Sequence, residues 1–433
     1  MRNLGVFIDN VLVGTLHNTD PLSFTYTQDC LSGLVRAPFS ALIPLEPGQI
    51  STTAVTSFFE NLLPEGDERT LLQVKYHVTT VFGMLSKVGG DTAGSVVILP
   101  EGQNPQPDDY LPVSWEDIGT LVNNATAAAP AVIAAADSNV SLSGAQHKLL
   151  LLLGDGGKPS LPLNASISTH ILKPDIKRTG LKVFSSAINE TLIMKLAHEC
   201  QLPTAPVEYL PKVQSCLVER FDREKDDDGN LKRLYQADLC QLLDKPSGVK
   251  YENDGGPSFK DCYDLVKNRS AVPLTDCHNM VQWLFFNLMV GNNDSHAKNL
   301  SMLNTNGKLR LAPFYDLMCT KVYAGLSINF AFKIGQHFEP GQINHQDVCE
   351  LADSIGINSR IMLKIALDIA DRIEKNLPSV AEALLPLTLK GSSEQILLDR
   401  ASKAIYSNIK KIKARLQPPA AQVLPSSGGK KPF

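Results

Sequence analysis

Three polar residues in the second half of the chain have the types and the spacing of a phosphoryl-transfer site. The segment Gly291-Asn-Asn-Asp-Ser-His-Ala-Lys-Asn299 follows an apolar helix predicted over Trp283–Val290. A kinase catalytic loop places an aspartate five residues before an asparagine, because one loop must present a proton acceptor to the hydroxyl and a neutral oxygen to Mg²⁺. Asp294 and Asn299 have this spacing, and Asp316 offers a second hard oxygen ligand 17 residues later. We expect Asp294 to be the catalytic residue and Asn299 and Asp316 to be metal ligands.

The same residues could instead end the preceding helix. Single residues such as Asn292, Asn293 or Asp294 more often cap a helix than take part in a reaction. A buried apolar helix does not normally end in so dense a polar cluster, and another carboxylate at the kinase position lies downstream. We therefore favour the kinase interpretation for the cluster as a whole.

Lys173 is the next candidate, at the end of an apolar strand predicted over Ser168–Lys173. A kinase needs a lysine that holds the α- and β-phosphates and a helix carboxylate that orients it. Glu190, on a helix that begins near Asn189, is the expected partner. Taken alone, Lys173 could equally be a surface lysine at a strand end. The order of the candidates along the chain favours the functional interpretation.

Ser141-Leu-Ser-Gly-Ala-Gln-His-Lys148 is the candidate phosphate loop, in which a turn at Gly144 would let backbone N–H groups approach the phosphates. It has one glycine instead of the three of Gly-x-Gly-x-x-Gly, so a serine-rich turn remains the alternative. Gly154-Asp-Gly-Gly-Lys158 looks more like a phosphate loop but is expected to be a hairpin tip between two strands. The residues that we assign to ATP in the candidate loop are Ser143, Gly144, Ala145 and Gln146.

Leu217-Val-Glu-Arg-Phe-Asp-Arg223 has the pattern of a kinase hinge strand. Its exit would offer backbone groups to adenine near Glu219, and Phe221 could pack on the ring. An ordinary strand exit would have the same local pattern. We also assign His296 and Lys298 to the ATP site, and His296 is expected to order the catalytic loop.

The elements that must position these residues change character along the chain. The first part opens with a predicted hairpin, Leu4–Ile8 and Val11–Leu16, around the turn pair Asp9-Asn10. A helix over Thr52–Leu63 and a strand over Ser95–Leu99 follow. The next part has the order of elements of a kinase N-lobe, with strands predicted over Leu149–Leu153, Ser168–Lys173 and Cys216–Phe221. Between the last two strands, a helix is predicted whose apolar face consists of Ile188, Leu192, Ile193, Leu196 and Ala197.

From about residue 235 the periodicity is helical. Helices are predicted over Leu234–Leu243, Phe259–Val266, Asp276–Val290, Ile361–Leu377 and Leu397–Leu416, whereas Leu309–Leu311 and Ser327–Phe332 look extended. The predicted fold class is therefore α+β, with two kinase-like lobes and a small β-rich N-terminal subdomain. The predicted boundaries are 1–105 for that subdomain, 106–222 for the N-lobe with the ATP loop, 223–416 for the helical C-lobe and 417–433 for a disordered tail.

Composition excludes several other classes of protein. The 433 residues have 43% hydrophobic and 20% charged content, which is close to the globular average, and a net charge of −4. The eight cysteines lack the paired spacing of a zinc site and are expected to be reduced, mostly buried thiols. No apolar run approaches the ~20 residues of a membrane span, and Asp9 interrupts any signal-peptide core. We expect a cytoplasmic protein without a membrane contact.

Together, five motifs resemble the HipA family of toxin kinases. They are Ser141–Lys148, His170–Pro174, Val218–Arg223, Asn292–Asn299 and Ala312–Leu317. Phe58-Phe-Glu-Asn-Leu-Leu-Pro-Glu-Gly66 and Gly89-Gly-Asp-Thr-Ala-Gly94 resemble the small N-terminal subdomain of that family. The resemblance spans roughly residues 1–415.

The resemblance implies a Ser/Thr protein kinase of a toxin–antitoxin system that uses ATP and Mg²⁺. It implies Asp294 as the catalytic residue, Asn299 and Asp316 as metal ligands and Lys173 as the phosphate lysine, with adenine near Glu219 and Phe221. Family members phosphorylate a serine of their own loop, and the matching residues here are Ser141 and Ser143. The implied partners are a helix-turn-helix antitoxin that binds DNA and a substrate in the translation machinery, such as an aminoacyl-tRNA synthetase.

Two other functions remain open from the residues. The chain could act chiefly as an ATP-binding partner of a DNA-bound repressor with little catalysis, or it could be a small-molecule kinase. Tyr315-Asp316-Leu317 replaces the usual Asp-Phe-Gly, and no Ala-Pro-Glu segment is visible. The regulation of ordinary kinases by their activation loop therefore cannot be carried over to this chain. The sequence names neither the substrate nor the oligomeric state, and it does not choose between Ser141 and Ser143.

The charge is uneven along the chain. Residues 401–433 carry seven basic and no acidic residues, whereas the first 400 carry 34 basic and 45 acidic residues, a net charge of −11. An apolar stripe in this end predicts a helix that docks on a lobe; it consists of Ile405, Ile409, Ile412 and Leu416. The cations of the same helix could face DNA phosphate; they are Lys403, Lys410, Lys411, Lys413 and Arg415.

Overall fold

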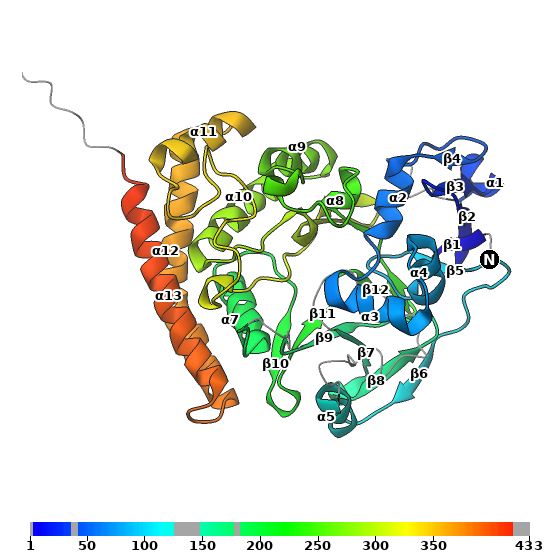
Figure 1. Ribbon diagram of the computed structural model, residues 1–433, viewed down its shortest axis with the longest axis horizontal. Helices are drawn as coiled ribbons and strands as arrows, with labels where there is room; N and C mark the ends of the chain where they lie inside the picture. Colours follow the sequence, from blue (N-terminus) through cyan, green and yellow to red (C-terminus); the bar gives the residue numbers. More distant parts are fainter. Residues whose placement is uncertain (1–2, 36–41, 125–147, 177–181, 419–433) are drawn as a thin grey trace, which may run out of the picture.

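A computed structural model describes residues 3–35, 42–124, 148–176 and 182–418 of the chain (Figure 1). Sheets gather in the N-terminal half and long helices in the C-terminal half, so the α+β prediction is confirmed. The candidate phosphate loop, including Ser141, Ser143, Gly144, Ala145 and Gln146, and the tail from residue 419 lie outside the described residues.

The N-terminal unit, residues 3–100, is built on a five-stranded antiparallel sheet. Its strands run in the order β4-β3-β2-β1-β5 and comprise β1 (Asn3–Ile8), β2 (Val11–His17), β3 (Ser23–Tyr26), β4 (Ile50–Ser51) and β5 (Val97–Pro100). Asp9 and Asn10 have φ values of 49° and 61°, which suits the two-residue turn between β1 and β2, and the predicted hairpin is confirmed. The helices of this unit are α1 (Gln28–Leu31), α2 (Thr53–Glu60), α3 (Gly66–Tyr76) and α4 (Val81–Val88).

The predicted N-lobe contains a six-stranded antiparallel sheet in the order β10-β11-β9-β7-β8-β6. Its strands are β6 (Asp109–Pro112), β7 (Leu149–Leu153), β8 (Pro159–Leu163), β9 (His170–Pro174), β10 (Val207–Leu210) and β11 (Ser215–Glu219), and its helices are α5 (Trp115–Asn124) and α7 (Ser186–Glu199). The turn at Gly154–Lys158 joins the paired strands β7 and β8, which confirms that it is a hairpin tip. The expected boundary near residue 105 falls between β5 of the first sheet and β6 of the second.

The C-terminal half is a helical assembly with two small sheets. Its helices are α8 (Leu239–Leu242), α9 (Phe259–Arg269), α10 (Pro273–Val290), α11 (His345–Ile355), α12 (Ser359–Leu384) and α13 (Ser393–Arg415). The hairpin β12 (Arg223–Lys225) and β13 (Leu231–Arg233) precedes a three-stranded sheet of β14 (Gln236–Asp238), β15 (Ser301–Thr305) and β16 (Lys308–Leu311). Single 3₁₀ turns occupy Asp155–Gly157, Pro211–Val213, Glu252–Asp254, Ala297–Asn299, Thr320–Val322 and Leu385–Leu387.

Two predicted elements of this half are wrong. Leu234–Leu243 is not one helix, because Gln236–Asp238 pairs with β15 as strand β14 and only Leu239–Leu242 is helical. Ser327–Phe332 forms a bent loop instead of a strand. Phe330 and Phe332 are buried there, so the apolar alternation reflects a loop anchored in the core.

The C-terminal helix α13 packs beside α12 at one edge of the molecule (Figure 1). Its stripe of Ile405, Ile409, Ile412 and Leu416 is buried, which confirms the predicted docking face. Three of the five cations considered for a DNA contact have partners within the chain: Lys403 pairs with Asp399, Lys413 pairs with Asp371 and Glu374, and Arg415 donates to the carbonyls of Ile343 and Pro340. Lys410 and Lys411 are exposed.

The helices of the described residues do not meet the requirements of a membrane span. Among residues 3–35, 42–124, 148–176 and 182–418, no helix combines the length and the apolar content that crossing a bilayer requires. All eight cysteines are free thiols and only Cys349 is not buried, as the sequence predicted.

Candidate active site

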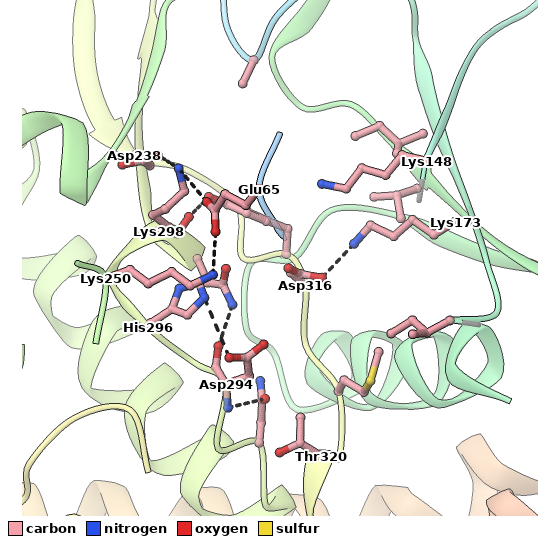
Figure 2. A pocket seen from close by; sticks show the side chains of 18 of the residues that line it. Glu65, Lys148, Lys173, Asp238, Lys250, Asp294, His296, Lys298, Asp316 and Thr320 are labelled. Carbon is pink, nitrogen blue, oxygen red and sulfur yellow. Dashed lines mark hydrogen bonds and ion pairs between the residues drawn. The ribbon is translucent and has the colours of Figure 1, made fainter. Parts of the chain in front are cut away.

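A cavity of about 260 Å³ lies where the N-terminal unit, the N-lobe and the C-terminal half meet. Each of the three parts contributes charged side chains to its wall, including Glu65, Lys173 and Asp294 (Figure 2). Asn299 and Asp316 also line the cavity. The fold therefore brings together candidate residues that are up to 143 positions apart in the sequence.

Lys173 lies near the end of β9 and binds two carboxylates. Its Nζ is 2.8 Å from Oδ1 of Asp316 (Figure 2). The same Nζ is 2.6 Å from Oε1 of Glu190 on α7. The predicted pairing of Lys173 with Glu190 is confirmed as an ion pair. Burial disfavours the charge on Lys173, but the two carboxylates outweigh burial and raise its pKa above the ordinary value. The ammonium is therefore permanently charged and held at the cavity.

Asp316 has a backbone conformation that non-glycine residues rarely adopt, with φ of 59°. Its side chain is 42% exposed, so one oxygen can face the cavity while the other accepts from Lys173. Burial acts to raise the pKa of Asp316, but the charges of Lys173 and Lys148 outweigh it and lower the pKa well below the usual range. Asp316 is thus an ionised carboxylate in a strained turn, a combination that often marks a functional site.

The candidate catalytic loop, which contains Asp294 and Asn299, begins where α10 ends at Gly291. This glycine has φ of 74°, and its N–H caps the helix by donating to the carbonyl of Asn287. Asn292 Nδ2 donates to Asn287 Oδ1 at 2.8 Å, and the N–H of Asn293 donates to Thr320 Oγ1 at 2.8 Å. The two asparagines therefore hold the loop to its surroundings, whereas Asp294 projects from it with a side chain that is 57% exposed.

The Asp294 carboxylate faces an aromatic and an imidazole side chain. The Tyr251 hydroxyl donates to its Oδ1, and Nε2 of His296 lies 3.9 Å from the same oxygen. Tyr251 and His296 contact each other edge to face, with ring centroids 5.0 Å apart. Sequence reasoning missed Tyr251, because its segment has no kinase motif.

His296 is buried and neutral at pH 7. Burial, together with the positive charge of Lys250, lowers its pKa to about 4. Its Nδ1 has no hydrogen-bond partner among the described residues. The side chain therefore lies beside Asp294 without adding a positive charge to the site.

Asn299 and Asp316 offer oxygen ligands suited to Mg²⁺. Nδ2 of Asn299 donates to the carbonyl of Asp294 at 2.9 Å, which assigns the other amide atom, Oδ1, as the oxygen available to a ligand. Within the described parts of the chain no group of three or more His, Cys, Asp or Glu side chains could hold a metal alone. The donor set fits Mg²⁺, which binds through one or two protein oxygens when phosphates supply others.

Lys298, which the sequence assigned to ATP, has three partners inside the protein. Its Nζ donates to Asn61 Oδ1 at 2.7 Å and lies 3.1 Å from Glu65 and 3.4 Å from Asp238. Burial acts to lower its pKa, but the two carboxylates outweigh burial and raise it. The charge of Lys298 is therefore compensated within the protein.

The apolar side of the cavity suits a planar ring. Ile171, Val218 and Met318 line it, and both hinge candidates, Glu219 and Phe221, are at its wall. Phe221 also packs on Tyr315, with ring centroids 5.6 Å apart. Lys148, the last residue of the candidate phosphate loop, reaches the same cavity, and burial and the charge of Lys173 lower its pKa.

The hinge segment also anchors the N-terminal unit, which the sequence did not reveal. Arg220 and Arg223 bind Asp91 at 3.3 and 2.7 Å, and both bind Asp222. Arg233 binds Asp91 at 3.3 Å. The sequence shows two polar motifs here, Gly89–Gly94 and Val218–Arg223, but nothing in it predicts that the two motifs contact each other.

Family models match most of the chain. A model described as HipA N-terminal domain matches residues 4–99, and one described as HipA-like C-terminal domain matches residues 140–377. The second match alone covers more than half of the chain.

Individual relatives support the same family, because they align over nearly their full length. A Sinorhizobium fredii protein named "Putative kinase Y4mE" is 33% identical, and the alignment covers 88% of this chain and 92% of the relative. The serine/threonine-protein kinase toxin HipA of Shewanella oneidensis is 28% identical, with 89% and 90% covered. A chain of the solved Shewanella oneidensis complex of HipA, HipB and operator DNA has the same fold, with a TM-score of 0.76, 24% identity and coverage of 95% and 96%. The chain therefore belongs to the HipA family of kinase toxins, and it is a kinase.

Proposed function

We propose that this chain transfers the γ-phosphate of ATP to a serine or threonine hydroxyl of a protein and thereby arrests growth. The observation that carries the proposal is the arrangement of Lys173, ion-paired to both Glu190 and Asp316, at a cavity that Asp294 and Asn299 also line. A lysine with a helix carboxylate, an isolated aspartate and a loop Asp–Asn pair are the parts that kinase chemistry requires.

Each residue has a distinct task in this mechanism. Lys173 binds the α- and β-phosphates, and Asn299 and Asp316 hold Mg²⁺ through oxygen atoms. The metal, when bound, neutralises charge on the transferred phosphate. Asp294 orients the substrate hydroxyl and accepts its proton, and Glu219 and Phe221 lie at the adenine end. We assign Lys298 and His296 to holding the loop, because Lys298 is bound by Glu65 and Asp238 and His296 packs on Tyr251.

We also propose that the kinase phosphorylates Ser141 or Ser143 in its own loop and is silenced by it. Support comes from Lys148, the last residue of the motif, which lines the cavity and whose pKa is affected by burial and by the charges of Lys173 and Asp316. A phosphate adds about −1.5 to −2 charge and would compete with the ATP phosphates for the same cations. Mass measurement before and after incubation with Mg²⁺-ATP would detect the added phosphate, and replacing each serine by alanine in turn would identify its site.

The remaining elements of the proposal concern partners and place of action. A solved chain of similar fold is part of a complex of HipA, HipB and operator DNA, which supports an antitoxin partner. We propose that this antitoxin has a helix-turn-helix that binds DNA and that the DNA contact of the chain itself is indirect or weak. On helix α13 the exposed Lys410 and Lys411 are the residues best placed for such a contact. The substrate would be a component of translation in the cytoplasm, such as an aminoacyl-tRNA synthetase.

Replacing Asp294 with Asn tests the central assignment. We expect Asp294→Asn to lower phosphate transfer by roughly 100- to 10,000-fold, the usual contribution of general base catalysis, and to abolish growth arrest. Asp353→Asn, at an exposed position of α11, is the matched control and should be fully active. Radiolabelled ATP and a cell lysate provide the assay and identify the labelled proteins. Undiminished transfer by Asp294→Asn would overturn the assignment, and labelling of a metabolite alone would favour a small-molecule kinase.

A further inference from the structure

The N-terminal unit contributes a carboxylate to the wall of the kinase cavity. Glu65 directly precedes α3, at a position where side chains usually cap the helix, yet it makes no cap hydrogen bond. Its side chain is 11% exposed and points toward Lys250 and Lys298 of the C-terminal half (Figure 2). Glu65 therefore neither caps its helix nor exposes its charge to water, and its partners lie in another part of the protein.

Glu65 lies between two lysines of the C-terminal half. Its Oε1 is 3.1 Å from Nζ of Lys298, and its Oε2 is 2.7 Å from Nζ of Lys250. Burial acts to raise the pKa of Glu65, but the charges of Lys298 and Lys250 outweigh it and lower the pKa to about 2. The carboxylate is ionised and bridges two segments that are not adjacent in sequence.

Both of these lysines are linked directly to the catalytic loop. Lys298 immediately precedes the candidate metal ligand Asn299. Lys250 immediately precedes Tyr251, whose hydroxyl donates to Oδ1 of Asp294. One carboxylate of the N-terminal unit therefore restrains both ends of the loop that carries the catalytic residue and a metal ligand.

The N-terminal unit is itself fastened to the segment that carries Lys250. Asn61 Nδ2 donates to the carbonyl of Lys245 at 2.9 Å, and Gln241 Nε2 donates to the carbonyl of Phe58 at 3.0 Å. The side chain of Asn61 also accepts from Lys298 at 2.7 Å. These hydrogen bonds all involve the short stretch 58–65, so they restrain the backbone that carries Glu65.

We propose that Glu65 is a positioning residue of the kinase reaction, through which the N-terminal unit sets the geometry of Asp294 and Asn299. This inference rests on the proposed function, because it concerns the same site. Displacement of a reacting group by about 1 Å can cost about 100-fold in rate, so a distant support of this kind can control turnover.

Glu65→Gln in the full chain tests the proposal, because it keeps the shape of the side chain and removes its charge. We expect kcat to fall by roughly 10- to 100-fold while KM for ATP changes by less than about 3-fold. The matched control is Glu60→Gln, which breaks the partly exposed ion pair of Glu60 with Arg69 in the same unit and should leave both constants unchanged. A large rise in KM for ATP with unchanged kcat would overturn the proposal, because it would indicate that Glu65 binds ATP directly.

Hydrogen exchange gives a readout that does not depend on activity. We expect amides of residues 291–300 to exchange at least about 5-fold faster in Glu65→Gln than in the wild type or in Glu60→Gln. Unchanged exchange in a folded Glu65→Gln protein would overturn the proposal even if kcat fell. If the wild type and Asp294→Asn were equally inactive, the proposed function would fail. Hydrogen exchange of residues 291–300 would still show whether Glu65 positions the loop.

Tyr251→Phe provides a second variant in case Glu65→Gln does not fold. It removes one hydroxyl and should lower kcat without changing KM for ATP. If the two residues act through the same connection, the double variant Glu65→Gln/Tyr251→Phe will lose less activity than the product of the single effects. Independent, multiplicative effects would overturn the connection through Lys250 and Tyr251.

Discussion

At the scale of single residues, the ion pairs of Lys173 serve both the stability of the protein and its chemistry. Glu190 is fully buried, and burial raises its pKa, so its charged form depends on Lys173, 2.6 Å away. Asp316 is partly exposed and can be solvated without Lys173. The two carboxylates should therefore respond differently when the lysine is removed.

Lys173→Met should remove phosphate transfer and destabilise the protein by about 3–5 kcal/mol, because it leaves Glu190 buried without a counter-charge. The double variant Lys173→Met/Glu190→Met should recover most of that stability, since no charge remains unpaired, but should stay inactive. Urea unfolding curves and a radiolabelled ATP assay measure the two effects. A double variant no more stable than the single one would contradict this account.

At the scale of elements, α12 contains a proline whose cost is partly offset by its neighbour. Pro378 lies in the interior of this 26-residue helix and has no N–H to donate to the carbonyl of Glu374. The hydroxyl of Tyr406, on α13, donates to that carbonyl at 3.4 Å. The packing of α13 on α12 thus satisfies a group that the helix itself leaves unpaired.

Pro378→Ala should restore the helical hydrogen bond and stabilise the protein by about 1–3 kcal/mol without changing its activity. Tyr406→Phe should destabilise the wild type more than it destabilises the Pro378→Ala variant, because in the variant the carbonyl already has a donor. Denaturant unfolding of the four proteins in this cycle measures the coupling. Equal effects of Tyr406→Phe in both backgrounds would show that the two groups do not interact.

At the scale of the whole molecule, buried charges attach the N-terminal unit to the N-lobe and to the β12–β13 hairpin. Asp91 is completely buried and binds Arg220, Arg223 and Arg233. The N–H of Gly94 donates to the carboxylate of Asp222, the other acid of this group, at 2.6 Å. The attachment holds the unit that carries Glu65 against the cavity.

Asp91→Ala should destabilise the protein by about 3–5 kcal/mol, because it removes the charge that compensates buried arginines. Hydrogen exchange should rise more in β1–β5 than in α10, since the N-terminal unit loses its attachment while the helical core is untouched. Asp155→Ala, at the exposed tip of the β7–β8 hairpin, is the control and should match the wild type. Uniform exchange changes across the chain would contradict an attachment role.

The parts of the site that the sequence predicted are those with local spacing or a fixed order. Asp294 and Asn299 occupy one loop, and Lys173 and Glu190 are 17 residues apart on a neighbouring strand and helix. Tyr251 and Glu65 were missed because their contacts with Asp294 and Lys250 span 43 and 185 residues. The helix predicted over Leu234–Leu243 was wrong because pairing with β15 overrode its helical periodicity.

The sequence by itself determined the family, the α+β class and the order of kinase candidates, because these depend on residue types and short spacings that any fold must respect. Apart from the predicted pair of Lys173 and Glu190, only the tertiary structure decided which charges compensate one another. Lys298 pairs with Glu65 and Asp238, and Lys413 and Arg415 of α13 have partners within the chain. Burial makes an unpaired charge costly, so the partner of each buried charge is set by which segments the folded chain brings within ion-pair distance.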